Sequence, residues 1–330
     1  MKSGEAIELQ LKVYIHNEYK DKDKDRITNL IALSNGTLCA SSNNKSIKTF
    51  QLNLNTNSKL TSTNYKRIIN IENAHTSSIF SICEIPSLNI ATILLLSSSL
   101  EGDIKLWNIT NTTYTLQLTI PNAHNGAIYK LTNISPIQTS FASCSEDRSI
   151  KLWNITNTYS PLTAVLKGHK DEVSSIIQPV NIDDTIVSVS YDNDLRFWNC
   201  KRYTCITVIH NIDCSSMNAV VNLKNKHIAI GGNELIYIVD PNKRCLLESI
   251  KCEPFDGYIT ALCTYRDTFF TMFNKKLYQI RKDVYNRNEY YKCYECERNK
   301  CFAHEALCII SNNYLASSND NNEILIFYIY

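Results

Sequence analysis

The chain has 330 residues, of which 44% are hydrophobic and 20% are charged, and this composition is typical of a folded globular protein and excludes a disordered one. Lysine and arginine total 34 against 32 aspartate and glutamate, so no strong net charge favours nucleic acid or an anionic membrane as a partner. The longest apolar run, residues 90–96 with the exception of Thr92, is too short for a membrane span, which needs roughly 20 apolar residues.

The N-terminal segment predicts a cytoplasmic or nuclear protein. Charges at Glu5, Glu8 and Lys12 interrupt the apolar stretch that a signal peptide would need. The chain contains 13 cysteines, and without an export signal we expect reduced thiols, some of them buried in strands as small apolar groups. The cysteines that fall in predicted strands are Cys39, Cys83, Cys144, Cys263 and Cys308.

The chain begins with a segment that has no local pairing partner. Residues 6–15 alternate apolar and polar side chains and predict a half-exposed strand. A run of mixed charges over residues 18–26 predicts a solvated loop. A first unit of three short apolar runs follows, with Phe50 in the last run, and a loop rich in Asn, Ser and Thr comes after it at residues 52–63.

Units two to four are built alike. Each has, in order, a His, two apolar runs, a polar turn and a third apolar run that contains a Trp. His124 precedes Trp153 by the same spacing as His169 precedes Trp198. A fourth apolar segment separates each Trp from the next unit, so every unit contributes four strands. The acidic residues in the polar turns are Glu101, Asp147 and Asp192.

The fifth and sixth units match this pattern less well. The fifth opens at His210 and has Ile238 where the earlier units have an aromatic residue. The sixth has Tyr278 in that place but no opening His and no turn Asp. Its four strands are expected at residues 245–250, 258–265, 268–274 and 276–280.

The seventh unit is one strand short. It opens at His304, ends at Phe327 and contains three apolar runs. The strand at residues 6–15 can supply the missing fourth, so we expect the two ends of the chain to pair and to close a ring. Closure buries sheet faces that single units cannot bury alone and removes exposed sheet edges.

These units resemble the WD-repeat β-propeller family. The run from Ser145 to Trp153 has the pattern S-x-D-x-S-I-K-L-W, and the family repeats every 40 to 45 residues or so. Where the family usually has Trp-Asp, this chain has Trp-Asn, at Asn108, Asn154 and Asn199. The resemblance implies an all-β fold, namely a seven-bladed β-propeller of four-stranded antiparallel blades that the N-terminal strand closes. A single domain over residues 1–330 would then have approximate repeats at 17–73, 74–122, 123–167, 168–209, 210–253, 254–303 and 304–330 plus the strand 6–15.

The resemblance also implies two hydrogen-bonded sets of buried side chains. These are His124, Ser143, Asp147 and Trp153 in the third unit and His169, Ser188, Asp192 and Trp198 in the fourth. A buried His, Asp and indole N–H each need a partner, and a chain of them satisfies all at once. A catalytic Ser/His/Asp triad is the other interpretation. Because a catalytic site would not recur from unit to unit, we predict a structural role.

One cluster of metal-binding residue types does not repeat. Cys293, Cys296, Cys301 and His304 are three thiols and an imidazole at short spacing, which could surround a tetrahedral Zn²⁺. His304, however, holds the opening position of the last unit, and alternating residues of a strand point to opposite faces. We therefore favour a structural interpretation and predict no bound cofactor.

The segment before His304 is longer than its counterparts and predicts an inserted surface loop. Its cations and aromatic rings could contact an acidic peptide or RNA, or could simply be solvated. The residues concerned are Arg281, Lys282, Arg287, Tyr290, Tyr291 and Lys292.

The motifs of common enzyme classes are missing from the sequence. It has no Gly-rich phosphate loop, no paired CxxC modules and no HExxH, and it contains only 8 glycines. A closed ring with variable loops suits a non-catalytic scaffold that binds other proteins or peptides and assembles a multiprotein complex, without a small-molecule substrate or a membrane. An RNA-associated subunit that uses residues 281–300 is the alternative, and an enzyme dependent on zinc or cysteine is a third.

The resemblance finally implies a partner-binding rim. In the family, the residue just before the turn Asp commonly lines this rim. The corresponding positions here are Asn43, Leu100, Glu146 and Tyr191.

Overall fold

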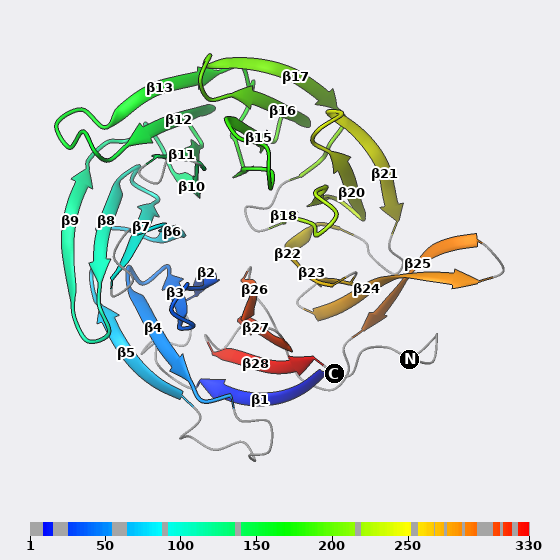
Figure 1. The fold of residues 1–330 in the computed structure, drawn as a ribbon, viewed down its shortest axis with the longest axis horizontal. Helices are drawn as coiled ribbons and strands as arrows, with labels where there is room; N and C mark the ends of the chain where they lie inside the picture. The colour runs from blue at the N-terminus through cyan, green and yellow to red at the C-terminus, as the bar shows by residue number, and fades with distance from the viewer. Residues whose placement is uncertain are drawn as a thin grey trace.

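The chain folds into a ring of seven four-stranded antiparallel sheets, or blades, in the computed structural model (Figure 1). The fold is the all-β, seven-bladed propeller that the sequence predicts. The structure describes residues 9–15, 26–54, 65–87, 92–135, 140–214, 219–251, 257–266, 268–273, 276–285, 288–295, 306–310, 313–318 and 323–329, with the backbone alone at 9–14 and 282–295.

Each blade runs from a strand near the centre of the ring to a strand on its outside (Figure 1). Blades one to three, in this order, are β2 (Ile27–Ala32), β3 (Leu38–Ser42), β4 (Ile47–Leu52) and β5 (Tyr65–Ile71); β6 (Ile79–Ile85), β7 (Ile93–Ser99), β8 (Ile104–Ile109) and β9 (Tyr114–Ile120); and β10 (Ile128–Asn133), β11 (Ser140–Ser145), β12 (Ser149–Asn154) and β13 (Leu162–Lys167).

The remaining blades repeat the same order. They are β14 (Ser175–Ile177), β15 (Thr185–Val189), β16 (Asp194–Asn199) and β17 (Thr204–His210); β18 (Val220–Asn222), β19 (Ile228–Gly231), β20 (Leu235–Asp240) and β21 (Cys245–Lys251); β22 (Ile259–Tyr265), β23 (Thr268–Phe273), β24 (Lys276–Tyr285) and β25 (Asn288–Glu295); and β26 (Leu307–Ile310), β27 (Tyr314–Ser318), β28 (Ile324–Ile329) and β1 (Leu9–Ile15).

The two ends of the chain meet in blade seven. β1 pairs antiparallel with β28, with Leu9 opposite Ile329 and Ile15 opposite Ile324. β1 lies outside β28 in the ring (Figure 1). This pairing covers the edge that β28 would otherwise expose, and an exposed strand edge is a site of aggregation.

The hydrophobic core lies between neighbouring blades. Trp153 of blade three packs on Ile85 and Leu96 of blade two. Trp198 of blade four packs in the same way on Ile150 of blade three. Since each sheet presents apolar side chains to both neighbours, every blade depends on the two beside it for its burial.

A β-bulge marks the aromatic position in the third strand, and it corrects the sequence interpretation of blade five. The register with the outer strand shifts immediately before Trp153 and Trp198 in blades three and four. In blade five the shift falls between Ile238 and Val239. Val239 therefore holds the aromatic position, and Ile238 lies one residue before it. Without an aromatic side chain to mark the bulge, the sequence did not reveal the extra residue.

Blade six also differs from the prediction. Residues 245–250 belong to β21, the outer strand of blade five, and the outer strand of blade six is β25. The segment expected as an inserted loop is thus largely a hairpin of β24 and β25, in which Arg281 lies opposite Lys292 and Lys282 opposite Tyr291. Its strands reach outward beyond the neighbouring blades (Figure 1). The Tyr-rich sequence favours a strand, because aromatic residues fit a pleated surface.

The cysteines in predicted strands do lie in strands, and all nine cysteines whose side chains the structure describes are free thiols. Burial raises the pKa of Cys83 to about 11 and that of Cys308 to about 12, so both thiols stay protonated near neutral pH. A helix capable of crossing a membrane does not occur in the part of the chain that the structure describes.

Deletion of residues 1–16 tests the role of β1. The deletion uncovers the edge of β28, so we expect a broadened unfolding transition and a melting temperature lower by at least about 5 °C in calorimetry. Deletion of residues 1–8 keeps β1 and is the control. An unchanged transition after the longer deletion would show that β1 is dispensable for the ring.

Candidate functional site

The side chains predicted to form a network in blade three are joined by hydrogen bonds. Trp153 donates its indole N–H to Ser143 Oγ at 2.8 Å, and Ser143 Oγ lies 2.6 Å from His124 Nε2. His124 Nδ1 lies 2.9 Å from Asp147 Oδ2. An indole can only donate and a carboxylate can only accept a hydrogen bond, so each donor in this chain is fixed. Trp153 donates to Ser143, Ser143 donates to His124, and His124 donates to Asp147.

Blade four repeats this network. Trp198 donates to Ser188 Oγ at 2.8 Å, Ser188 Oγ lies 2.7 Å from His169 Nε2, and His169 Nδ1 lies 2.9 Å from Asp192 Oδ2. Burial of the ring is the main cause that lowers the pKa of His169, as it lowers the pKa of the matching histidine in blade three. A neutral imidazole with its proton on Nδ1 agrees with the direction of the bonds.

The same networks fix the turns above them. Asp147 Oδ1 accepts the backbone N–H of Ser149 at 3.0 Å, and Asp147 Oδ2 accepts the backbone N–H of Asn125 at 3.1 Å. Burial acts to raise the pKa of Asp147, but the hydrogen bonds from His124, from the Ser149 hydroxyl and from the backbone N–H of Asn125 outweigh it and lower that pKa. The carboxylate thus ties the turn between β11 and β12 to the segment that enters β10.

Blade two holds an incomplete copy that the sequence pattern alone did not reveal. His75 Nε2 lies 2.7 Å from Ser97 Oγ, and Trp107 donates to the same oxygen at 2.9 Å. Glu101 bonds Thr76 instead of the histidine, so His75 Nδ1 is buried without a hydrogen-bond partner among the described residues. A serine at the same distance before the Trp in all three units was the signal that could have revealed it.

The serine hydroxyls of both networks are buried. Ser143 is fully buried and Ser188 is 1% exposed, so neither hydroxyl faces solvent. This burial favours the structural interpretation, in which the networks hold blade and turn together.

The four predicted rim residues lie in the turns between the second and third strands of blades one to four. Since all blades repeat one strand order around the ring, these turns lie on one face of it. In each blade the backbone N–H of the rim residue donates to a carbonyl just before the innermost strand. These bonds run from Asn43 to Arg26 (2.9 Å), from Leu100 to Ser78 (2.9 Å), from Glu146 to Ala127 (3.0 Å) and from Tyr191 to Glu172 (3.0 Å).

Side chains connect the rim from blade two to blade four. Phe80 and Tyr129 have ring centroids 5.9 Å apart, and Tyr129 donates its hydroxyl to Glu172 Oε2 at 2.6 Å. Burial and the neighbouring Glu172 raise the pKa of Tyr129, so its hydroxyl keeps its proton. Leu100 and Tyr191, in the rim turns of blades two and four, are each 45% exposed. The rim therefore offers aromatic and carboxylate groups at fixed positions.

The predicted zinc cluster falls mostly beyond the described residues. Cys293 lies on β25, with only its backbone described, and Cys296, Cys301 and His304 are outside the described ranges. A group of side chains able to hold a metal ion is not found among those the structure does describe. Of the inserted residues, Arg281 and Lys282 lie on β24, Tyr290, Tyr291 and Lys292 lie on β25, and Arg287 is outside the described ranges.

Substitution of the turn acid tests the network. Asp147→Ala leaves the Nδ1–H of His124 and two backbone N–H groups without their acceptor, so we expect a loss of about 1–3 kcal/mol in the free energy of unfolding. Glu101→Ala is the matched control, because Glu101 holds the same position without bonding His75. Equal losses from both variants in urea denaturation would contradict the assigned role of Asp147.

The orphaned histidine predicts a pH dependence. Burial is the main cause that lowers the pKa of His75 to about 3, against roughly 6.5 in an unfolded chain. As the pH falls below 6.5, the unfolded chain binds a proton that the folded chain does not, so stability falls by up to about 1.4 kcal/mol per pH unit.

His75→Gln removes this titration. The difference in unfolding free energy between the natural protein and the variant should therefore shrink as the pH falls from 7 to 4. A difference that stays constant over this range would show that His75 protonates equally well in both states.

Comparison with known proteins supports the repeat pattern. The family described as WD domain, G-beta repeat matches residues 114–154 and 160–199, which contain the strands β9 to β12 and β13 to β16. No curated protein matches the chain. Two repeats thus carry the family pattern directly, and all seven blades have its four-stranded form. The chain therefore contains WD repeats, within a ring of seven four-stranded blades.

Proposed function

We propose that this protein is a non-catalytic scaffold that binds protein partners through the rim of blades two to four and so assembles a multiprotein complex. WD-repeat propellers generally are protein-interaction scaffolds. The observation that carries the proposal is the connected set of aromatic and carboxylate groups around Tyr129, held by hydrogen bonds that leave Leu100 and Tyr191 exposed.

The rigidity of the turns favours binding. Each rim residue is held by a backbone hydrogen bond, and Glu146 Oε2 also accepts the backbone N–H of Ala127 at 3.0 Å. A surface that is already ordered loses little conformational entropy when a partner binds. Tyrosine is also among the residues that most often dominate the energy of interfaces.

The charge of this rim indicates what kind of segment it would bind. Glu146 is exposed and Glu172 is half-buried against Tyr129, on the same rim as the exposed side chains of Leu100 and Tyr191. A partner segment with an apolar side chain and a nearby lysine or arginine would complement this surface. The RNA-associated alternative depends on residues 281–300 and stays a prediction.

A double substitution tests the rim. We expect Glu146→Arg with Tyr191→Ala to lose at least one protein partner that the natural chain retains in quantitative affinity purification. The matched control is Asp183→Arg with Tyr159→Ala, because both residues lie exposed in turns at the opposite ends of the strands. If the rim variant retains every partner, or if the control loses the same ones, the assignment of the rim is wrong.

A further inference from the structure

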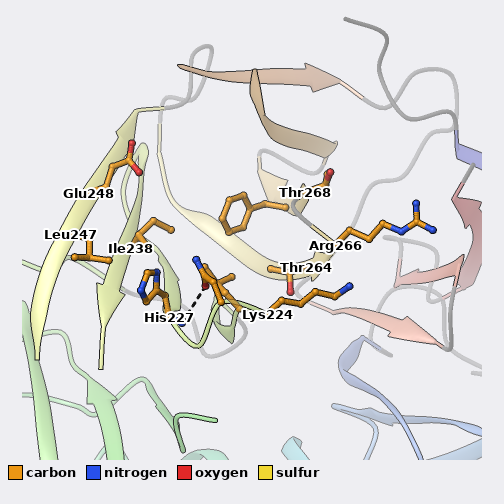
Figure 2. Close-up of a pocket in the computed structure, with 11 residues that line it drawn as sticks. Lys224, His227, Ile238, Leu247, Glu248, Thr264, Arg266 and Thr268 are labelled. Carbon is orange, nitrogen blue, oxygen red and sulfur yellow. Dashed lines mark hydrogen bonds between the residues drawn. The ribbon is translucent and has the colours of Figure 1, made fainter. Parts of the chain in front are cut away.

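A cavity opens between blades five and six, on the face of the ring opposite the rim. Its volume is about 360 Å³. Blade five contributes the turn between β18 and β19 and part of β21, and blade six contributes the turn between β22 and β23 (Figure 2). The cavity shares no residue with the rim, so a role for it is independent of the function proposed for the rim.

Strands of unequal length meet at the cavity. β22 and β23 of blade six have 7 and 6 residues, whereas β18 and β19 of blade five have 3 and 4. Phe269 on β23 pairs with Ile280, as Phe141 pairs with Trp153 in blade three, so Phe269 lies at the level of the aromatic position of its blade. The end of β22 and the start of β23 thus face the turn that follows the short strand β18 across the recess.

The floor of the recess is apolar. Ile238 and Phe269 are buried in the core between the two blades and line it from either side. Leu247 on β21 lines it too, and this side chain is 44% exposed. Apolar surface therefore continues from the cavity onto the outer strand, where burial by a bound group would be favourable.

Positive and negative side chains lie on different sides of the cavity entrance. Lys224 and Arg266 lie on one side of the cavity, and Glu248 lies on the other (Figure 2). Arg266 stacks on the ring of Tyr265 at 5.0 Å, and neither Lys224 nor Arg266 forms an ion pair within the ranges that the structure describes. The imidazole of His227 adds a polar group at the wall. The side with the two cations favours a carboxylate, and Glu248 disfavours one on the other side.

We propose that this recess binds a short acidic segment of a protein partner, with one apolar side chain in the cavity and an adjacent carboxylate on Lys224 and Arg266. The volume is near the lower end of the roughly 300–1,000 Å³ of small-ligand pockets and suits one or two side chains. A peptide, in contrast to a free organic acid, can also cover Leu247 on the outer strand. The protein thus has a second interface that selects partners of opposite charge to those of the rim.

A random twelve-residue peptide library displayed on phage tests this proposal against the full chain. We expect enrichment of peptides in which a large apolar residue is next to Asp or Glu. A fluorescein-labelled copy of the most enriched peptide should bind at least tenfold more weakly to Lys224→Glu with Arg266→Glu, measured by anisotropy. Thr264→Phe, which fills the recess, should weaken binding to a similar extent.

Two control variants show whether the loss of peptide binding is specific to the recess. Lys243→Glu with Arg244→Glu reverses two exposed charges in the β20–β21 turn outside the cavity and should leave peptide affinity within twofold of that of the natural chain. The rim variant Glu146→Arg with Tyr191→Ala should also bind the peptide normally, so failure of the rim and failure of the recess are distinguishable. Since Lys224 and Arg266 are exposed, their variant decides the outcome even if Thr264→Phe fails to fold.

Several results would overturn the proposal. These are the absence of any enriched peptide, enrichment of basic peptides, or equal binding to the natural chain and to the Lys224/Arg266 variant. Binding of octanoate, tested as a small amphiphilic acid, with no peptide enriched would assign the recess to a small molecule and would equally contradict a protein partner.

Discussion

The burial of each sheet between two neighbours is the constraint on which the rest of the structure depends. A four-stranded blade has apolar side chains on both faces, and it cannot cover either face itself. The contact between the last blade and the first completes the series. Phe50 and Ile27 of blade one pack with Ala316 and Ile326 of blade seven, and Tyr314 donates its hydroxyl to the carbonyl of Leu54 at 2.9 Å. The ring therefore has no blade with an uncovered face.

Within this frame, the buried polar networks set the position of the rim turns. A histidine that must stay neutral and hydrogen-bonded joins the Trp of the third strand to the turn that comes after the second. That turn also holds the backbone of the rim residue. The energetic cost of burying a histidine, a serine and an aspartate is offset only when all of their bonds are made, which fixes one geometry. Blade two, with one bond missing, shows how the fold tolerates a single orphaned group.

The sequence predicted those parts of the molecule that local patterns determine. The spacing from His124 to Trp153 repeats at His169 and Trp198, so the blade and its polar network followed from three or four residues of fixed chemistry. The predicted positions of strands and aromatic residues were wrong in blades five and six, where the Trp and the turn Asp of the repeat are missing. Val239 occupies the aromatic position without an aromatic side chain, and β25 was taken for part of a loop because no Trp or Asp preceded it.

The cavity between blades five and six could not be predicted from any local sequence pattern. It lies between the β18–β19 turn and the β22–β23 turn, which belong to separate sheets that the ring places side by side. Lys224, Glu248 and Arg266 are far apart in sequence and are ordinary surface residues when considered singly. Only the fold brings them to one recess, where the proposed acidic segment would meet all three.

The central claim is that all seven blades form one closed body in which each blade buries its neighbours. Native-state hydrogen exchange tests this claim most directly. The account predicts that the amides of β28 in blade seven and of β12 in blade three are protected to a similar degree and open together under mild denaturant, because neither blade can lose its neighbours separately. Exchange of β28 well ahead of β12, with the other blades still protected, would contradict a closed ring.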